Sequence, residues 1–352
     1  MPPFRHPVAR AGFAIRSIDA PDGPAPVHTT DRQVTPFYAV IEFDCPQRAA
    51  AGTVVVVPPL SGVLPRLIRD IILGLLPRFR VLVPEWINPR FVPRTAGSFG
   101  FQGNIAGIIA AMQAAGPGAG LVALCQSGTP ALAAATVMET RGDPAAPAML
   151  ALMGAPIDPF AAPTSLSRYF VRTPMWRLAM AVTPVPFGFP GAGRSVYAAE
   201  TQRTILATNR MRSLLMPMWP GLSPDMAEIE AHLPFAEHSR MMMDMEGRQF
   251  LENIDLVFRR RALLDGRLHY GGQPVTPAAL RRCALLTIEG DRDGIIAPGQ
   301  TVPAHALCSG LPVERRAVVL AEGCHHLSLF RGPLFQSRVL PELLARLDRW
   351  VA

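Results

Sequence analysis

Short apolar runs alternate along the chain with segments whose apolar residues recur at helical spacing. Residues 53–57 form an unbroken β-branched run, typical of a strand covered on both faces, and residues 64–75 then repeat apolar positions as a helix does. The alternation continues with expected strands at 80–83, 121–124 and 149–153 and expected helices at 101–115 and 130–136. This order predicts an α/β fold with a mostly parallel, doubly wound sheet.

The alternation stops after residue 156 and resumes at residue 284. The stretch between is largely helical in pattern, with Pro-rich joints and many Met residues, and we expect it to be a lid inserted into the sheet domain. Its Met and Trp side chains, Met218 and Trp219 among them, either fill a helical core or form an apolar surface that grips irregular material. Beyond it, a buried strand begins at residue 284, another covers 318–320, and a helix covers 340–351.

These patterns divide the chain into four parts. Residues 1–34 are rich in Pro, Ala and Arg and show no sustained period, so we expect a loosely ordered arm. Residues 35–156 and 283–352 form the two parts of the sheet domain, and residues 157–282 form the lid. A chain of 352 residues is long enough to bury one large core with such an insertion.

Composition narrows the class of protein. No stretch of 18 apolar residues predicts a membrane helix, and Arg10 and Arg16 interrupt the nearest candidate for a signal sequence. The five Cys residues are widely spaced, which favours reduced thiols in the cytoplasm over a zinc site or disulfides. The net charge of +7 comes from scattered Arg residues without interleaved aromatics, a pattern that does not indicate nucleic-acid binding.

An apolar run that ends on a Cys has the clearest chemical meaning. The sequence Leu-Val-Ala-Leu-Cys-Gln-Ser-Gly at 121–128 places small residues, Ala123 and Ser127, two positions to either side of Cys125. A nucleophile on a sharp strand-to-helix turn needs small neighbours there because the backbone and the next helix come close. The pattern predicts Cys125 as a nucleophile. Two alternatives are a buried structural Cys and Ser127 as the nucleophile, although the neighbours of Ser127 are bulkier.

The residues that follow supply an acid and a base in the order nucleophile, acid, base, which is typical of α/β-hydrolases. Asp293 follows a buried strand through a Gly-x-x-Asp spacing, and His326 lies on a turn after the strand at 318–320. We predict Asp293 as the acid that orients the base and His326 as the base. Asp291 and His325 are the alternatives at the two positions.

Backbone amides are expected to bind the oxyanion that such a nucleophile creates. One is the amide of Gln126, directly after the nucleophile, and the other belongs to the loop after the first core strand. Pro58 and Pro59 have no amide proton, so the second donor is Leu60 or Ser61. This chemistry requires no metal and no organic cofactor.

Six separate segments carry motifs that together are specific. They are Pro-Leu-Ser-Gly at 59–62, Glu-Trp-Ile-Asn-Pro-Arg at 85–90, Cys-Gln at 125–126 with a Pro at 130, Met-Gly-Ala-Pro-Ile-Asp at 153–158, the acid segment at 289–301 and the His segment at 323–330. From about residue 35 to the last residue, the chain resembles the intracellular polyhydroxyalkanoate (polyhydroxybutyrate) depolymerases, which are α/β-hydrolases with a Cys nucleophile. The resemblance also selects the second His of the pair.

The resemblance implies a cytoplasmic enzyme that hydrolyses ester bonds of poly- or oligo-(R)-3-hydroxyalkanoate, with the polymer or the granule surface as its partner. The chain departs from the family pattern after Gln126, where Ser127-Gly128 replaces a Pro, and after the acid and the base, at Gly294 and at Leu327-Ser328. These departures leave two alternatives open. One is an acyltransferase or thioesterase on soluble acyl thioesters, with coenzyme A in place of water, and the other is a granule-associated binding protein with weak activity. The oligomeric state is not indicated.

Overall fold

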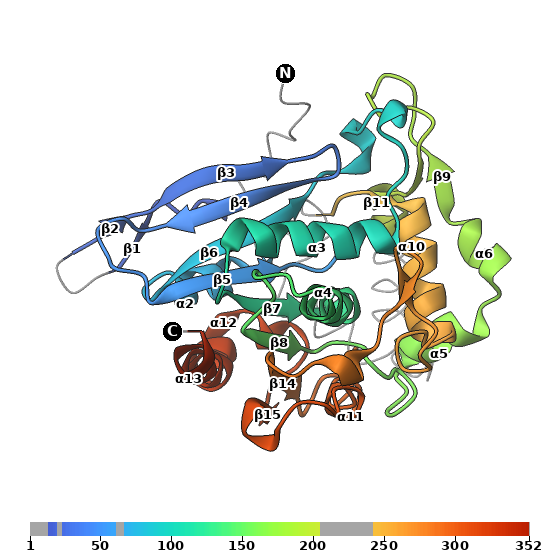
Figure 1. Cartoon of the computed structure of the whole chain (residues 1–352). Helices are drawn as coiled ribbons and strands as arrows, with labels where there is room; N and C mark the ends of the chain where they lie inside the picture. Colours follow the sequence, from blue (N-terminus) through green and yellow to red (C-terminus); the bar gives the residue numbers. More distant parts are fainter. Residues whose placement is uncertain (1–12, 20–22, 61–66, 205–241, 352) are drawn as a thin grey trace.

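An eight-stranded, mostly parallel sheet forms the centre of the computed structural model, which describes residues 13–19, 23–60, 67–204 and 242–351 (Figure 1). Six neighbouring strands are parallel, and the last two at one edge are joined by antiparallel pairing. In spatial order the strands are β15 (Arg316–Ala321), β14 (Ala284–Gly290), β8 (Met149–Met153), β7 (Gly120–Leu124), β5 (Gly52–Val57), β6 (Phe79–Trp86), β4 (Tyr38–Asp44) and β3 (His28–Val34).

The unbroken apolar runs are strands that are buried on both faces. In β5, Val55 and Val57 belong to one apolar cluster, whereas Val54 and Val56 belong to a second cluster on the opposite face. Successive side chains of a strand point to opposite faces, so a strand with helices on both sides has no position left for a polar residue. This explains why the sequence of β5 lacks the alternation of a half-exposed strand.

Helices cover both faces of the sheet. On one face, α3 (Phe101–Ala115) and α4 (Gly128–Thr140) pack against each other and against the sheet (Figure 1). On the other face lie α2 (Arg69–Leu75) and α13 (Leu340–Trp350). The shorter elements around them are α11 (Ala304–Leu307), α12 (Gly332–Leu334) and the π-helical η9 (Phe335–Val339), with 3-10 turns η2 (Pro89–Phe91), η3 (Arg94–Ala96), η4 (Cys125–Ser127), η6 (Pro277–Ala279), η7 (Val313–Arg315) and η8 (Leu327–Leu329).

The N-terminal segment differs from the expected loose arm in the part that the structure describes. Strands β1 (Ser17–Ile18) and β2 (Ala25–Pro26) pair with each other, and β3 pairs with β4 at the edge of the main sheet. The Phe13 side chain is buried, with its ring centroid 5.1 Å from that of Phe43. A strand at a sheet edge needs little apolar periodicity, which explains why the polar sequence at 28–34 did not predict one. Residues 1–12 lie outside the described part.

The insertion lies at the carboxyl ends of the parallel strands, on the right in Figure 1, and it mixes helices with short strands. A three-stranded sheet in the order β11-β10-β9 pairs two strands from the first half of the insertion, β9 and β10, with one from its second half, β11. Its described elements are α5 (Ser165–Arg172), α6 (Met175–Ala179), β9 (Val182–Pro184), β10 (Ser195–Tyr197), β11 (Met245–Glu246), α10 (Gly247–Asn253), the π-helical η5 (Ile254–Arg259), β12 (His269–Tyr270) and β13 (Gln273–Pro274). The expectation of a largely helical lid therefore missed these strands. Met218 and Trp219 lie outside the described residues.

A buried ion pair and a set of hydrogen bonds from Arg194 attach the insertion to the sheet domain. Arg90, which follows β6, donates through Nε to Asp244 Oδ2 at 2.8 Å, and the Asp244 side chain is 1% exposed. Arg194 donates to the backbone carbonyls of Val92, Pro93 and Gly97. These bonds hold the insertion against the loop after β6. Within the part of the chain that the structure describes, no helix has the length and apolar character needed to cross a membrane.

Candidate active site

Cys125 lies on a strained turn between β7 and α4. Its φ angle is +51°, a left-handed conformation that a residue with a side chain rarely adopts. The helix that follows packs so closely that a Cβ at Gly128 would overlap the Cβ of Ala155. The residues around Cys125 are small because the backbone and the following helix come close there, as the sequence indicated. The turn has the geometry of a nucleophile elbow.

His326 and Asp293 form a buried pair on two neighbouring loops. His326 Nδ1 lies 2.7 Å from Asp293 Oδ2, and both residues are less than a tenth exposed. The second carboxylate oxygen, Asp293 Oδ1, accepts hydrogen bonds from the amides of Ile295 at 2.9 Å and Ile296 at 2.8 Å. Since the loop backbone holds this carboxylate, its other oxygen fixes the orientation of the imidazole.

Cys125 is close enough to the same imidazole to interact with it by charge and by a side-chain hydrogen bond. Burial of the imidazole opposes protonation, but the Asp293 carboxylate and then Cys125 outweigh it and raise the pKa of His326 well above its ordinary value. The protonated imidazole offers a counter-charge to a neighbouring thiolate, which is the reactive form of a thiol. The structure therefore brings the three predicted residues into one contact series.

The alternative acid and base lie elsewhere. Asp291 is exposed, and its amide donates to the carbonyl of Ala321. The imidazole Nδ1 of His325 lies 3.0 Å from the carbonyl oxygen of Arg292, so this ring packs on the loop that carries Asp293 and not against Cys125. The geometry favours Asp293 as the acid and His326 as the base, two roles for which the sequence offered two candidate residues each.

Two of the predicted oxyanion donors are in the described structure. The amide of Gln126 lies in the first turn of η4 and α4, where N–H groups have no acceptor within the helix. Leu60 is buried on the loop after β5, the strand next to β7. Ser61 lies outside the described residues.

Ser127 and Trp86 anchor the loop that carries Leu60. The carbonyl oxygen of Pro58 accepts one hydrogen bond from Ser127 Oγ at 2.6 Å and another from Trp86 Nε1 at 3.2 Å. Because Pro58 and Pro59 have no amide protons, this carbonyl is an important attachment point for the loop backbone. Ser127 therefore connects the loop to the elbow, and its hydroxyl is fully buried.

We expect Ser127→Ala to lower kcat by about tenfold or less and to leave KM nearly unchanged. The variant loses one hydrogen bond, worth about 1 kcal/mol, while Trp86 still holds the Pro58 carbonyl. Steady-state kinetics on a soluble ester measure the change, with Ser127→Thr as the control that keeps a hydroxyl. Complete loss of turnover with an unchanged melting temperature would instead identify Ser127 as the nucleophile.

Contacts around His326 include groups that the sequence analysis did not single out. Gly154, at φ +53°, lies against the imidazole, and a Cβ there would approach Leu329 Cδ1 to 3.1 Å. The ring of Phe330 meets the imidazole edge-on at 5.2 Å between centroids. Gly154 lies in the Met-Gly-Ala-Pro motif. A Gly at this position of the motif allows the backbone to approach the His326 imidazole closely.

All five cysteines are free and buried. Cys45, Cys283, Cys308 and Cys324 pack in the apolar clusters of the sheet domain. Burial raises the pKa of Cys283 well above its ordinary value, that of Cys308 to about 12, and that of Cys324 less strongly. Among the five, Cys125 alone combines an elbow backbone with an imidazole contact.

Comparison with protein families identifies the class of this protein. The model for the PHB de-polymerase C-terminus matches residues 154–350, more than half of the chain and including Asp293 and His326. The chain belongs to the PHB depolymerase C-terminus family. It is a carboxylic ester hydrolase with an α/β-hydrolase fold.

Solved structures share the fold at low sequence identity. The 2-hydroxy-6-oxo-6-phenylhexa-2,4-dienoate hydrolase BphD of Rhodococcus sp. strain RHA1 is 15% identical with a TM-score of 0.51, covering 91% of this chain and 99% of its own. A carboxylesterase from the thaumarchaeon Nitrososphaera gargenis is 13% identical with a TM-score of 0.53, covering 92% and 99%. No curated protein sequence matches the chain significantly. At these identities the likeness establishes the fold alone.

Proposed function

We propose that the protein is a polyhydroxyalkanoate depolymerase that cleaves ester bonds of poly- or oligo-(R)-3-hydroxyalkanoate through a Cys125–His326–Asp293 triad. The observation that carries the proposal is the contact series from the elbow thiol through a buried imidazole to a carboxylate held by two amides. Family membership supports the polymer as substrate. The series is the arrangement that nucleophilic acyl transfer requires.

In the first half of the reaction, the Cys125 sulfur, whose proton is held by His326 Nε2, attacks the ester carbonyl carbon. The negative charge that develops on the carbonyl oxygen is stabilised by the amides of Gln126 and Leu60. When the carbon–oxygen bond breaks, His326 returns the proton to the leaving alkoxide, and the hydroxyl-terminated chain departs. A thioester on Cys125 remains.

In the second half, His326 takes a proton from a water molecule, whose oxygen attacks the thioester carbonyl. The thioester bond breaks, the carboxylic acid product forms, and the proton returns to the sulfur. Asp293 stays ionised throughout and stabilises the imidazolium at each stage. A thiol as acceptor would instead yield a thioester product.

Product analysis with matched substrates tests this proposal. We expect the purified protein to release 3-hydroxy acids or their short oligomers from amorphous polymer granules and to act far more slowly on soluble acyl-coenzyme A. Chromatography with mass detection quantifies both products. Turnover of acyl-coenzyme A alone would identify a thioesterase or acyltransferase, and granule binding without product would identify a binding protein.

Exposed apolar side chains on the insertion support action at a polymer surface. Trp176 and Met180 are 67% and 72% exposed and are four residues apart around α6, so they share one face. Other exposed apolar side chains of the same part of the chain are Phe160, Tyr169 and Phe187. These exposed apolar groups on the insertion are suited to contact with a polyester.

We expect Trp176→Ser combined with Met180→Ser to weaken hydrolysis of insoluble polymer and to leave hydrolysis of a short soluble ester nearly unchanged. Adsorption scales with apolar area removed from water at about 25 cal/mol per Å2, so the loss of two exposed side chains weakens it by about tenfold or more. Granule sedimentation and the two hydrolysis rates measure this. The control changes Val313 and Val318, which are similarly exposed near the sheet edge. An equal fall of both activities with the melting temperature would contradict a surface role.

A further inference from the structure

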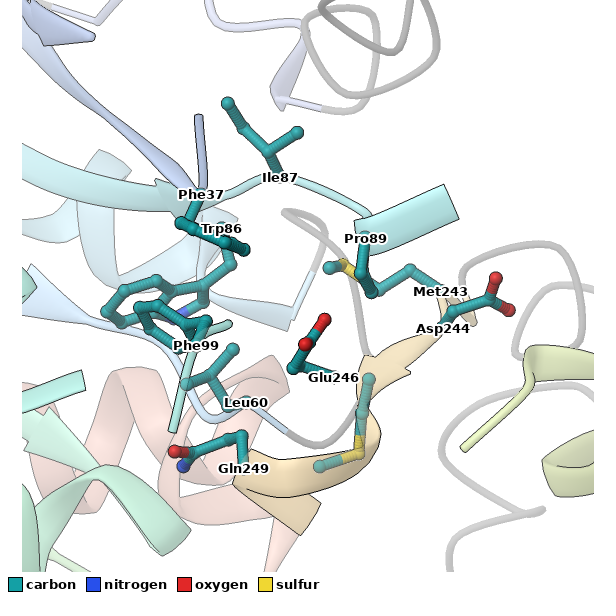
Figure 2. Close-up of a pocket in the computed structure, with 11 residues that line it drawn as sticks. Phe37, Leu60, Trp86, Ile87, Pro89, Phe99, Met243, Asp244, Glu246 and Gln249 are labelled. Atoms are coloured by element: carbon teal, nitrogen blue, oxygen red, sulfur yellow. The ribbon is translucent and has the colours of Figure 1, made fainter. Parts of the chain in front are cut away.

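A small pocket lies beside the loop that carries Leu60, between the end of β6 and the insertion (Figure 2). Its walls are mostly apolar, and its cavity of about 20 Å3 has room for a group about the size of a water molecule. The residues that line it are Phe37, Leu60, Trp86, Ile87, Pro89, Phe99, Met243, Asp244, Met245, Glu246 and Gln249. The pocket is separate from the contact series of Cys125.

Among the described residues, two buried acceptor oxygens of side chains that line this pocket have no hydrogen-bond partner. They are Oε2 of Glu246 and Oε1 of Gln249, whose residues are 8% and 2% exposed. The other carboxylate oxygen of Glu246 accepts a hydrogen bond from Arg194 at 3.1 Å. Figure 2 shows the Glu246 carboxylate standing between the Trp86–Phe99 side and Pro89. Buried acceptors without a donor are costly, so this arrangement is suited to a ligand that donates.

The charge of Glu246 limits which donor fits. Burial raises the pKa of its carboxyl, and Arg194 and the Phe99 amide offset only part of that rise. In its ionised form, paired with Arg194, this carboxylate repels other anions and accepts strong hydrogen bonds from neutral hydroxyl groups. The pocket therefore favours an alcohol over a carboxylate.

The pocket lies within reach of a chain bound at Cys125. Strands β7, β5 and β6 are neighbours in this order, and the pocket lies at the carboxyl ends of β5 and β6. Strands lie about 4.8 Å apart, so the end of β6 is about 10 Å from the elbow. A short chain of hydroxyalkanoate units can span this separation, with Leu60 contributing to both sites.

The repeating unit of a polyhydroxyalkanoate contains an ester group and hydrocarbon, so it accepts hydrogen bonds but donates none. Its hydroxyl end is the one neutral donor on the chain, because the opposite end is a carboxylate near neutral pH. We propose that the Glu246–Gln249 pocket binds the terminal hydroxyl group of the substrate, so that the enzyme cleaves short units from the hydroxyl end. This inference rests on the proposed hydrolysis of polyhydroxyalkanoates.

Two matched substrates test the inference. One is a short (R)-3-hydroxybutyrate oligomer with a free hydroxyl end, and the other is the same oligomer with that hydroxyl acetylated. We expect kcat/KM for the free oligomer to exceed that of the capped oligomer by about tenfold or more, since one hydrogen bond to a carboxylate is lost. Equal rates on both substrates overturn the inference and leave the proposed function intact. Failure to hydrolyse either contradicts the proposed function itself.

Variants separate recognition of the hydroxyl from general stability. Glu246→Gln and Gln249→Met remove or weaken one acceptor each and keep similar volume, and we expect each to bring the free-to-capped ratio of kcat/KM close to one. The control is Glu342→Gln, which removes the same charge from an exposed position on α13. Because both substrates meet the same protein, partial unfolding lowers both rates and leaves the ratio unchanged. A wild-type ratio in both variants overturns the assignment to these residues.

Discussion

Replacement of Cys125 by alanine is expected to abolish ester hydrolysis while the protein keeps its fold. In the proposed mechanism the thiol provides the attacking atom, and the Ser127 hydroxyl does not replace it because it is buried and bonded to the Pro58 carbonyl. Cys125→Ser is expected to retain slow turnover, because a hydroxyl is the weaker nucleophile in this position. Rates on a soluble ester, together with the melting temperature, measure the effect.

Mass spectrometry of the trapped acyl-enzyme provides a second measurement. The acyl group is expected on the peptide that contains Cys125 and on none that contains Cys324, the other cysteine near the site loops. Full activity in Cys125→Ala, or an acyl group on a different residue, would contradict the assignment of the nucleophile.

His326→Ala is expected to lower kcat by about 10²- to 10⁴-fold, whereas His325→Ala leaves most of it. His326 touches both Cys125 and Asp293, and its raised pKa keeps a proton beside the thiol. His325 instead contacts the carbonyl of Arg292. Adjacent residues on this turn thus face different groups, although they are chemically identical.

The two variants remove the same side chain from adjacent positions, so each is the control for the other. Besides kcat, the rate of Cys125 alkylation near neutral pH is expected to fall in His326→Ala, since the imidazolium counter-charge is lost. It is expected to stay near the wild-type rate in His325→Ala. A reversed ranking would mean that the turn presents the first His to the elbow.

The core of the fold could be predicted because its strands are buried on both faces. The runs at 53–57, 121–124 and 149–153 each became a strand, and helices formed at Phe101–Ala115 and Gly128–Thr140. Burial on both sides leaves an apolar signal that the sequence carries without any partner information. The edge strand β3 carries no such signal because its pairing comes from β4.

Part of the candidate site could also be predicted from the sequence, and part could not. The position of Cys125 on a strained turn could be predicted because such a turn requires small neighbours, and the positions of Asp293 and His326 on loops because strands end shortly before them. Their catalytic roles stay predictions. The choice between His325 and His326 depends on a turn geometry that spacing does not encode. Trp86 donates a hydrogen bond to the carbonyl of Pro58, which is far from it in the sequence. The pattern of neighbouring residues does not indicate such a contact.

The contact of the Cys125 thiol with an imidazole, which three other buried thiols lack, has a consequence for oxidative stress. Peroxides oxidise thiolates, and the raised pKa values of Cys283, Cys308 and Cys324 keep these three groups protonated inside the core. Oxidation is therefore expected to begin at Cys125 and to give a sulfenic acid that an external thiol can reduce. The proposed hydrolysis would then stop reversibly under oxidising conditions, a sensitivity that a serine at the elbow would not confer.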